Sequence, residues 1–126
     1  MSNNIAYLQN DAFDSSGNLT FSTDNKPLLV MVKASWCGHC KHAAPGFQEF
    51  ADKYSDKVIC GCIREGDGQT PSEKKLMDRL KDLMPSFRGF PHYVMYVNGK
   101  AVNGTVSDRS VDGYKDFVSK HAGIKL

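Results

Sequence analysis

The sequence predicts a single α/β domain built on a central mixed β-sheet flanked by helices, and three observations support this prediction. The chain has 126 residues, of which 40% are hydrophobic, which suits one hydrophobic core but not two ordinary domains. Short apolar runs typical of buried strands alternate with segments whose apolar residues recur at helical spacing. Near the C-terminus, the dipeptide Asn98-Gly99 between two apolar segments indicates an antiparallel hairpin.

The N-terminal part is expected to lead into the central strand. We expect a short strand at residues 4–8. The stretch Asn10–Asn25 is rich in Asn, Asp, Ser and Gly, which predicts loops around another short strand at Leu19–Phe21. Leu28–Ala34 is an apolar run interrupted only by Lys33, as is typical of a strand covered on both faces.

The middle of the chain predicts a helix, a strand and a second helix. A helix of about four turns, kinked near Pro45, should follow the central strand. Val58–Ile63 indicates a second buried strand. Thr70-Pro71-Ser72-Glu73 has the pattern of a capping box, so we expect the second helix to run from there to about Met84. Its charged residues between 73 and 82 are expected to face solvent. The residues expected to face inward are Leu76, Leu80 and Leu83.

The C-terminal part predicts a β-hairpin followed by a helix. Tyr93–Val97 and Ala101–Val106 flank Asn98-Gly99 and are expected to form the two strands of the hairpin. The last helix should end near Gly123, because glycine commonly terminates helices. Its apolar residues at helical spacing are Val111, Tyr114, Phe117 and Val118.

Composition and charge exclude several classes of partner. The chain has 16 basic and 14 acidic residues without long runs of either sign, so we expect no nucleic-acid and no membrane partner. No stretch approaches the roughly 20 apolar residues of a membrane span. The first six residues lack the pattern of a secretory leader, and the last four match neither an ER-retention nor a peroxisomal signal. As given, the sequence predicts a cytoplasmic monomer whose partners are proteins.

The most informative motif is Trp36-Cys37-Gly38-His39-Cys40, which directly follows the central strand. On the first turn of a helix, the sulfur of Cys37 would lie near unpaired backbone N–H groups and the positive end of the helix dipole, which favour a thiolate. Cys40 lies one turn later on the same face and can attack a mixed disulfide formed by Cys37. The pattern therefore predicts a dithiol that cycles with its disulfide and needs no bound cofactor.

The other two cysteines are interpreted as small buried apolar residues. Cys60 and Cys62 point to one face of a strand about 6.6 Å apart, with parallel side chains that do not favour a disulfide between them. The alternatives for Cys37 and Cys40 are a structural disulfide or half of a zinc site. A zinc site would need Cys60 and Cys62 as its other ligands, and a Cys-x-Cys within a buried strand is a poor zinc knuckle, so no metal is expected.

Two segments resemble a known family. Trp36 to Pro45 reads WCGHCKHAAP, which closely resembles the active-site segment of protein disulfide isomerase catalytic (a-type) domains in the thioredoxin superfamily. Further along, Arg88-Gly89-Phe90-Pro91 resembles the segment of that family that contains its cis-proline. The resemblance covers roughly residues 26–122 and leaves 1–25 as a loop-rich N-terminal segment. It implies a single thioredoxin-fold domain over residues 1–126.

The resemblance also implies how the site is built on its substrate side. Cys37 and Cys40 take the roles of nucleophile and resolving thiol, and Trp36 shields them. Pro91 lies against the dithiol in cis, and the backbone of Phe90 pairs with an extended substrate.

Other residues implied by the resemblance tune the thiols. Gly38 and His39 between the cysteines favour an oxidising disulfide. Arg109 stands in the stretch that holds the family's mobile arginine, which lowers the pKa of the resolving thiol. Met31 occupies the position where the family usually keeps a buried carboxylic acid that relays a proton. Lys33 lies on the same strand face as Met31, and we hypothesise that it supports the thiolate electrostatically instead.

Together these observations predict a thiol-disulfide oxidoreductase and isomerase that acts on protein thiols and disulfides and exchanges electrons with a reductase or an oxidase. One alternative is a thioredoxin-like reductant fed by a reductase. The other is a redox-inactive module that holds extended peptides around Trp36, Phe90 and Pro91. An oxidising motif conflicts with a cytoplasmic location. A stand-alone isomerase-like domain of a large DNA virus that assembles in the host-cell cytoplasm would reconcile the two.

Overall fold

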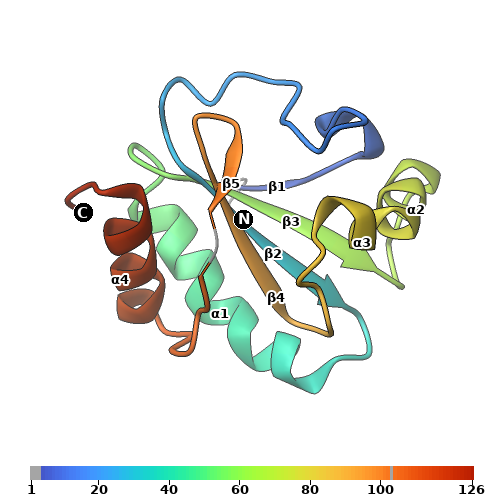
Figure 1. Cartoon of the computed structure of the whole chain (residues 1–126). Coiled ribbons are helices and arrows are strands. Elements are labelled where there is room, and N and C mark those ends of the chain that lie inside the picture. Colours follow the sequence, from blue (N-terminus) through green and yellow to red (C-terminus); the bar gives the residue numbers. More distant parts are fainter. Residues whose placement is uncertain (1–3, 103) are drawn as a thin grey trace.

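The structure, a computed structural model, describes residues 4–102 and 104–126. Within these residues the chain forms a five-stranded sheet with the strand order β1-β3-β2-β4-β5 (Figure 1). β1, β3 and β2 are parallel, whereas β4 pairs antiparallel with both β2 and β5, which confirms the predicted mixed sheet. The strands are β1 (Ile5–Tyr7), β2 (Leu28–Ala34), β3 (Ile59–Glu65), β4 (His92–Val97) and β5 (Lys100–Val102).

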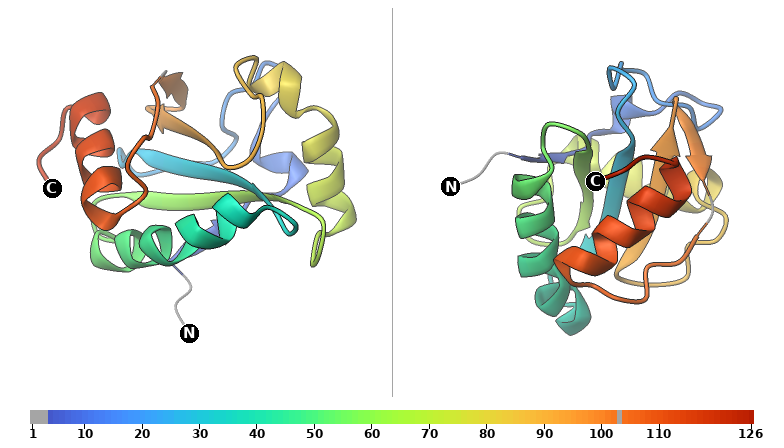
Figure 2. Two further views of the ribbon diagram at one scale, coloured as in Figure 1. Left: turned by 90° about the horizontal axis from the view of Figure 1, so that it is seen from below. Right: turned by 90° about the vertical axis from the view of Figure 1, so that its left-hand side faces the viewer.

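Helices cover both faces of this sheet (Figure 2). They are α1 (Gly38–Lys53), α2 (Pro71–Asp78), α3 (Leu80–Leu83), α4 (Val111–Ala122) and a short 3-10 helix, η1 (Asn10–Ala12). α1 and α4 pack on one face, and α2, α3 and the N-terminal segment pack on the other. None of the helices in the described part of the chain combines the length and apolar character that crossing a membrane requires.

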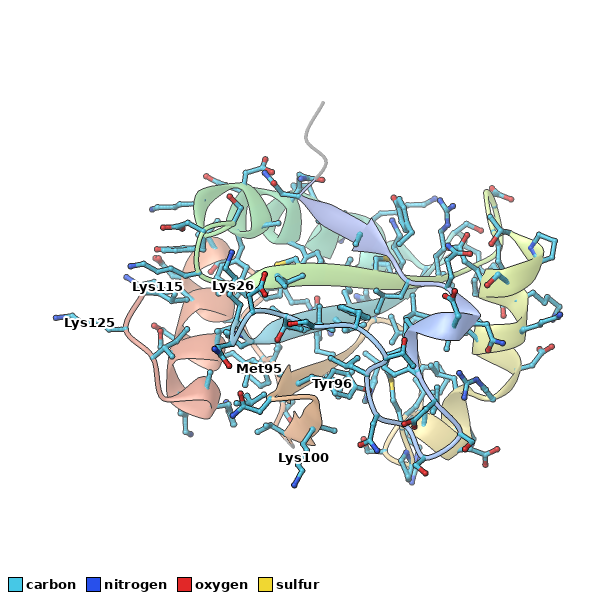
Figure 3. The ribbon with its side chains drawn as sticks, turned by 90° about the horizontal axis from the view of Figure 1, so that it is seen from above. Lys26, Met95, Tyr96, Lys100, Lys115 and Lys125 are labelled. Carbon is cyan, nitrogen blue, oxygen red and sulfur yellow. The ribbon has the colours of Figure 1, made fainter. Side chains whose placement is uncertain are left out.

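β2 lies at the centre of the sheet, as predicted. It pairs with β3 along one edge and with β4 along the other. Because both edges and both faces are covered, the strand is buried from Leu28 to Val32, and Lys33 is its half-buried exception near the end that leads to α1. Successive residues of β4 also enter opposite layers, as Met95 and Tyr96 show (Figure 3).

α1 is a continuous helix that contains Pro45 and buries its apolar side against the sheet. Gly46 lies where the segment before α4 approaches α1 most closely. A Cβ atom at this position would be 2.6 Å from the carbonyl oxygen of Arg109. Glycine is therefore what lets the Arg109 segment lie directly against the helix that carries the dithiol.

The prediction of one continuous second helix is wrong. The helix stops at Asp78, leaves helical geometry at Arg79 and resumes as α3. The Arg79 side chain donates hydrogen bonds to backbone carbonyls of the N-terminal segment, at Asn10 (2.7 Å) and Phe13 (2.7 Å). This tertiary anchor holds Arg79 at the break, and its partners are distant in sequence, so helical spacing alone cannot reveal it.

The capping box at the start of α2 is present as predicted, but the expectation that Glu73 faces solvent is wrong. Thr70 Oγ1 accepts the backbone N–H of Glu73, and Glu73 accepts the backbone N–H of Thr70. The carboxylate is fully buried, and Arg64 also donates to it, from Nε at 2.6 Å and from Nη2 at 3.1 Å. The Arg64 guanidinium in turn lies over the ring of Tyr7, 4.0 Å from its centroid.

The N-terminal segment contributes more than loops. β1 pairs with β3, and Leu8, Ala12 and Phe13 are buried in the layer under α2 and α3. The hydrophobic core therefore begins well before residue 26. The strand expected at Leu19–Phe21 is wrong, because the structure has only a bridge between Phe13 and Leu19 there.

The hairpin forms as predicted, but with a shorter second strand. Asn98 (φ 53°) and Gly99 (φ 80°) both adopt the positive φ that a type I′ turn requires. The expected strand Ala101–Val106 is wrong in its bounds, since β5 covers Lys100–Val102. Residue 103 lies outside the described residues, and 104–109 form no strand. The last helix and its left-handed cap at Gly123 agree with the prediction.

Replacing Glu73 by glutamine should destabilise the fold. Burial alone would raise the pKa of Glu73, but the hydrogen bonds from Arg64 and Thr70 and the Arg64 charge outweigh it and lower the pKa. Glu73→Gln leaves Arg64 without its charged partner, so we expect the free energy of unfolding to fall by about 2 kcal/mol at neutral pH. Denaturant unfolding would measure the loss.

The effect should depend on pH. Because the pKa of the folded carboxyl is lowered, its contribution is complete above the ordinary glutamate pKa and disappears as the pH falls through the folded value. The difference between Glu73→Gln and the parent should therefore shrink in acid. Lys74→Ala is the matched control, because its ion pair with Asp78 is exposed and should not contribute measurably. Equal stability of parent and Glu73→Gln at neutral pH would contradict the assignment.

Candidate functional site

The site begins in the turn between β2 and α1. The backbone N–H of Cys37 donates to the carbonyl oxygen of Ala34 (3.1 Å), which closes the turn between strand and helix. Cys37 is the N-cap of α1, and its Sγ accepts the backbone N–H of Cys40 at 3.1 Å. A sulfur at this position receives a hydrogen-bond donor and the positive end of the helix dipole together.

The two thiols of the motif have different surroundings. Both are free, but Cys37 is half-buried whereas Cys40 is only 2% exposed. The pKa of Cys40 is raised to about 11, mainly by burial and also by the Cys37 side chain, while the positive charge of Arg109 opposes both effects. One sulfur is thus accessible and the other is held protonated behind it at neutral pH.

An aromatic surface lies beside the dithiol. Trp36 is 65% exposed, and its ring meets the ring of Phe90 edge to face, with centroids 6.1 Å apart. The peptide bond between Phe90 and Pro91 is cis. The structure therefore brings the segment before β4 to the start of α1, although the two are far apart in the sequence.

Gly38 and His39 lie in the open. Nothing stands within 4 Å of where a Cβ of Gly38 would be, so the fold itself does not demand glycine there. His39 is exposed on the first turn of α1.

Lys33 and Cys40 line one cavity of about 160 Å³ on the β3 side of the dithiol. Arg64 lines the same cavity, and Lys33 Nζ lies 5.6 Å from the centroid of the Tyr7 ring. Lys33 and Cys40 thus line the same cavity, while the positive charge of Lys33 acts to lower the pKa of Cys62. The cavity is lined by side chains of both charges, because Glu65 and Asp67 line it together with Lys33 and Arg64.

Arg109 lies on the β4 side of the dithiol. It lines a second cavity of about 250 Å³ together with Pro91, His92 and Tyr93. Its positive charge opposes the rise in the pKa of Cys40, whose largest cause is burial. Burial lowers the pKa of His92, which packs edge to face against Phe87.

Cys60 and Cys62 are buried in β3. Burial raises the pKa of each thiol to about 12, which makes both unreactive near neutral pH. Within residues 4–102 and 104–126, no group of three or more His, Cys, Asp or Glu side chains is placed to hold a metal ion.

Sequence reasoning missed a polar pair inside the core. The hydroxyl groups of Tyr93 and Tyr114 are 2.7 Å apart and buried between β4 and α4. Tyr93 stands beside Met31 in the antiparallel register of β4 and β2. Both tyrosines fit an apolar pattern in the sequence. The register that places Tyr93 beside Met31 becomes visible only in the fold.

Comparisons with known proteins agree with this geometry. The sequence model of the family described as Thioredoxin matches residues 4–120. The thioredoxin-like protein 453L of Invertebrate iridescent virus 6 is 36% identical over 110 residues, which are 78% of this chain and 79% of that protein. Protein disulfide-isomerase of Saccharomyces cerevisiae is 32% identical over 98 residues, which are 76% of this chain but 17% of that protein.

Solved structures support the same fold. The J-Trx1 fragment of ERdj5 has a TM-score of 0.65 at 21% identity and covers 96% of this chain and 53% of its own. The zinc-bound form of human ERp44 has a TM-score of 0.65 at 19% identity, over 92% of this chain and 30% of its own. The predicted thioredoxin fold is thus confirmed. Because the family model matches nearly the whole length of the chain, the chain belongs to the Thioredoxin family.

Proposed function

We propose that the chain is a thiol-disulfide oxidoreductase of the protein disulfide isomerase type that acts on protein clients. The observation that carries the proposal is the placement of the Cys37 sulfur, which is accessible, caps a helix and accepts the N–H of Cys40 at 3.1 Å. Cys40 lies about one turn further along α1, where it is buried and protonated at neutral pH. This asymmetry suits a reaction in which one thiol attacks and the other resolves.

In the reducing direction, the Cys37 thiolate attacks one sulfur of a client disulfide. The client S–S bond breaks, a mixed disulfide forms, and the departing client thiolate takes a proton from solvent. Cys40 then loses its proton and attacks the Cys37 sulfur, which releases the second client thiolate and leaves the Cys37–Cys40 disulfide. Two electrons pass from the dithiol to the client, and the reverse sequence oxidises a client.

The surrounding residues have separate roles in this proposal. The aromatic surface of Trp36 and Phe90 contacts extended client segments beside the Cys37 sulfur. Arg109 stabilises the Cys40 thiolate as it forms, because its positive charge lowers the pKa of that thiol. Gly38 and His39 favour an oxidising disulfide. The dithiol is reset by a reductase or an oxidase partner, and no bound cofactor takes part.

Cys37→Ser should abolish both insulin reduction and the reactivation of scrambled ribonuclease, because no thiolate remains to open a client disulfide. Cys60→Ala is the matched control. It also removes one thiol, but from the buried interior of β3, and both activities should persist. Activity of Cys37→Ser above background would reject the proposed chemistry and favour a module that only binds peptides.

The four thiols should react with iodoacetamide in a fixed order in the folded protein. Cys37 should be alkylated first because it is accessible. Cys40 should react slowly at neutral pH and faster as the pH approaches its pKa of about 11, since the thiolate is the reactive form. Cys60 and Cys62 should stay unmodified until the protein is unfolded. Peptide mass spectrometry checks this order, and equal rates at Cys37 and Cys40 would contradict it.

Lys33→Met should raise the pKa of Cys40, because it removes a positive charge from the cavity that both residues line. We expect a shift of about one pH unit, which corresponds to a tenfold lower thiolate fraction. The ultraviolet absorbance of the thiolate follows the titration. Lys100→Met, on exposed β5 (Figure 3), is the control. Unchanged thiol titrations in Lys33→Met would refute a role for Lys33.

A further inference from the structure

The two cavities beside the dithiol differ in how their charges are balanced. On the β3 side, Glu65 and Asp67 line the same cavity as Lys33. The Arg64 guanidinium on that side is already paired with Glu73 at 2.6 Å. The cavity of about 250 Å³ on the β4 side is different, because its described lining includes a cation but no carboxylate. Among the residues that line it are Ser86, Pro91, His92, Tyr93, Thr105 and Arg109.

Arg109 is the cation of the β4-side cavity, and it has no anionic partner among the described residues. Its side chain is exposed and takes part in neither of the ion pairs found in the described part of the chain. The preceding residue, Asp108, instead accepts the backbone N–H of Ser110 through Oδ1 (3.0 Å). A guanidinium presents a planar fork of N–H donors that matches a carboxylate. Arg109 is therefore available to bind an anionic group from outside the chain.

The cavity lies close to where a client would be held at Cys37. Pro91 lines it and directly follows Phe90, whose ring belongs to the aromatic surface beside the dithiol. The Arg109 segment lies against α1, the helix that Cys37 caps, because a Cβ atom at Gly46 would be 2.6 Å from the Arg109 carbonyl oxygen. An extended segment advances about 3.3 Å per residue. Client residues within about three positions of the attacked cysteine can therefore reach the cavity.

The neutral residues of the cavity also suit a carboxylate. Ser86 and Thr105, which line it, carry hydroxyl groups that can donate hydrogen bonds. Burial lowers the pKa of His92, so its ring is neutral at neutral pH and retains one N–H donor. A lysine or arginine of a client would instead meet Arg109 as a like charge. The cavity can thus discriminate between clients by the sign of their charge.

We propose that the cavity around Arg109 is a client subsite that takes the carboxylate of an aspartate or glutamate close to the client cysteine. The Arg109 guanidinium binds the carboxylate and holds the neighbouring client sulfur near Cys37. The chain therefore prefers client disulfides that are flanked by acidic residues. This inference rests on the proposed function, because it concerns which clients reach Cys37. It gives Arg109 a role in substrate choice in addition to its effect on Cys40.

Short peptides with a single cysteine test this preference. Their ends are acetylated and amidated, and the cysteine carries 2-thiopyridine as a mixed disulfide, so the only charge is the one under test. The Cys37 thiolate of the reduced protein attacks the peptide sulfur, and a disulfide between Cys37 and the peptide forms. The 2-thiopyridine leaves, takes a proton from solvent and becomes pyridine-2-thione, whose absorbance gives the rate. This step precedes any attack by Cys40, so it does not depend on the pKa of that thiol.

The measured quantity is the ratio of second-order rates for peptides that differ only in one residue within three positions of the cysteine. At low salt we expect the glutamate peptide to react about three- to tenfold faster than its glutamine counterpart, and the lysine counterpart to react more slowly than both. Arg109→Met should bring the glutamate-to-glutamine ratio close to one. Because a ratio is compared, a general change in the reactivity of Cys37 cancels.

Lys41→Met is the matched control. Lys41 is also an exposed cation beside the dithiol, but it lines the cavity on the β3 side. Its replacement removes the same charge from the neighbourhood of Cys37 and leaves the Arg109 cavity intact. The glutamate-to-glutamine ratio of Lys41→Met should therefore equal that of the parent.

The outcomes separate this proposal from the proposed function. A ratio of one in the parent at every position tested, or a ratio that survives in Arg109→Met, would overturn the subsite while leaving the dithiol chemistry intact. A ratio that falls as much in Lys41→Met would also overturn it, because the preference would then reflect the general positive charge around the dithiol. If the parent releases pyridine-2-thione no faster than Cys37→Ser does, the proposed function itself fails.

Discussion

The hydrogen bond from the Cys40 backbone N–H to the Cys37 sulfur is the interaction on which the whole site depends. It exists because α1 begins at a fixed place. β2 is held between β3 and β4, and its last carbonyl oxygen, at Ala34, accepts the N–H of Cys37. A strand that is buried on both faces and paired on both edges cannot slide, so the first turn of the helix cannot shift either. One sulfur therefore faces outward and the other inward.

The unequal surroundings of the two thiols follow from this placement. A sulfur at the helix start is accessible and receives a backbone donor, whereas a sulfur one turn later enters the layer between α1 and the sheet, where burial favours the protonated thiol. Met31 offers neither an acid nor a base, and charged groups stand on two flanks of Cys40. Lys33 and Glu65 line the cavity on the β3 side, and Arg109 stands on the β4 side.

Local patterns in the sequence predicted the elements whose causes are local. The apolar run Leu28–Ala34 predicted β2, the capping-box pattern from Thr70 to Glu73 predicted the start of α2, and Asn98-Gly99 predicted the turn of the hairpin. The break at Arg79 was not predictable, because its hydrogen bonds reach residues far away in the sequence. The same reason applies within the site. The motif identified the cysteines, but only the sheet register places Tyr93 beside Met31.

Lys33 and Arg109 stand on opposite flanks of Cys40 and would act on it in the same sense. A fixed positive charge stabilises the thiolate relative to the thiol, so it raises the equilibrium fraction of thiolate. Met31 offers neither an acid nor a base, so in the proposed function the balance between burial, which favours the protonated thiol, and these cations sets how readily Cys40 ionises.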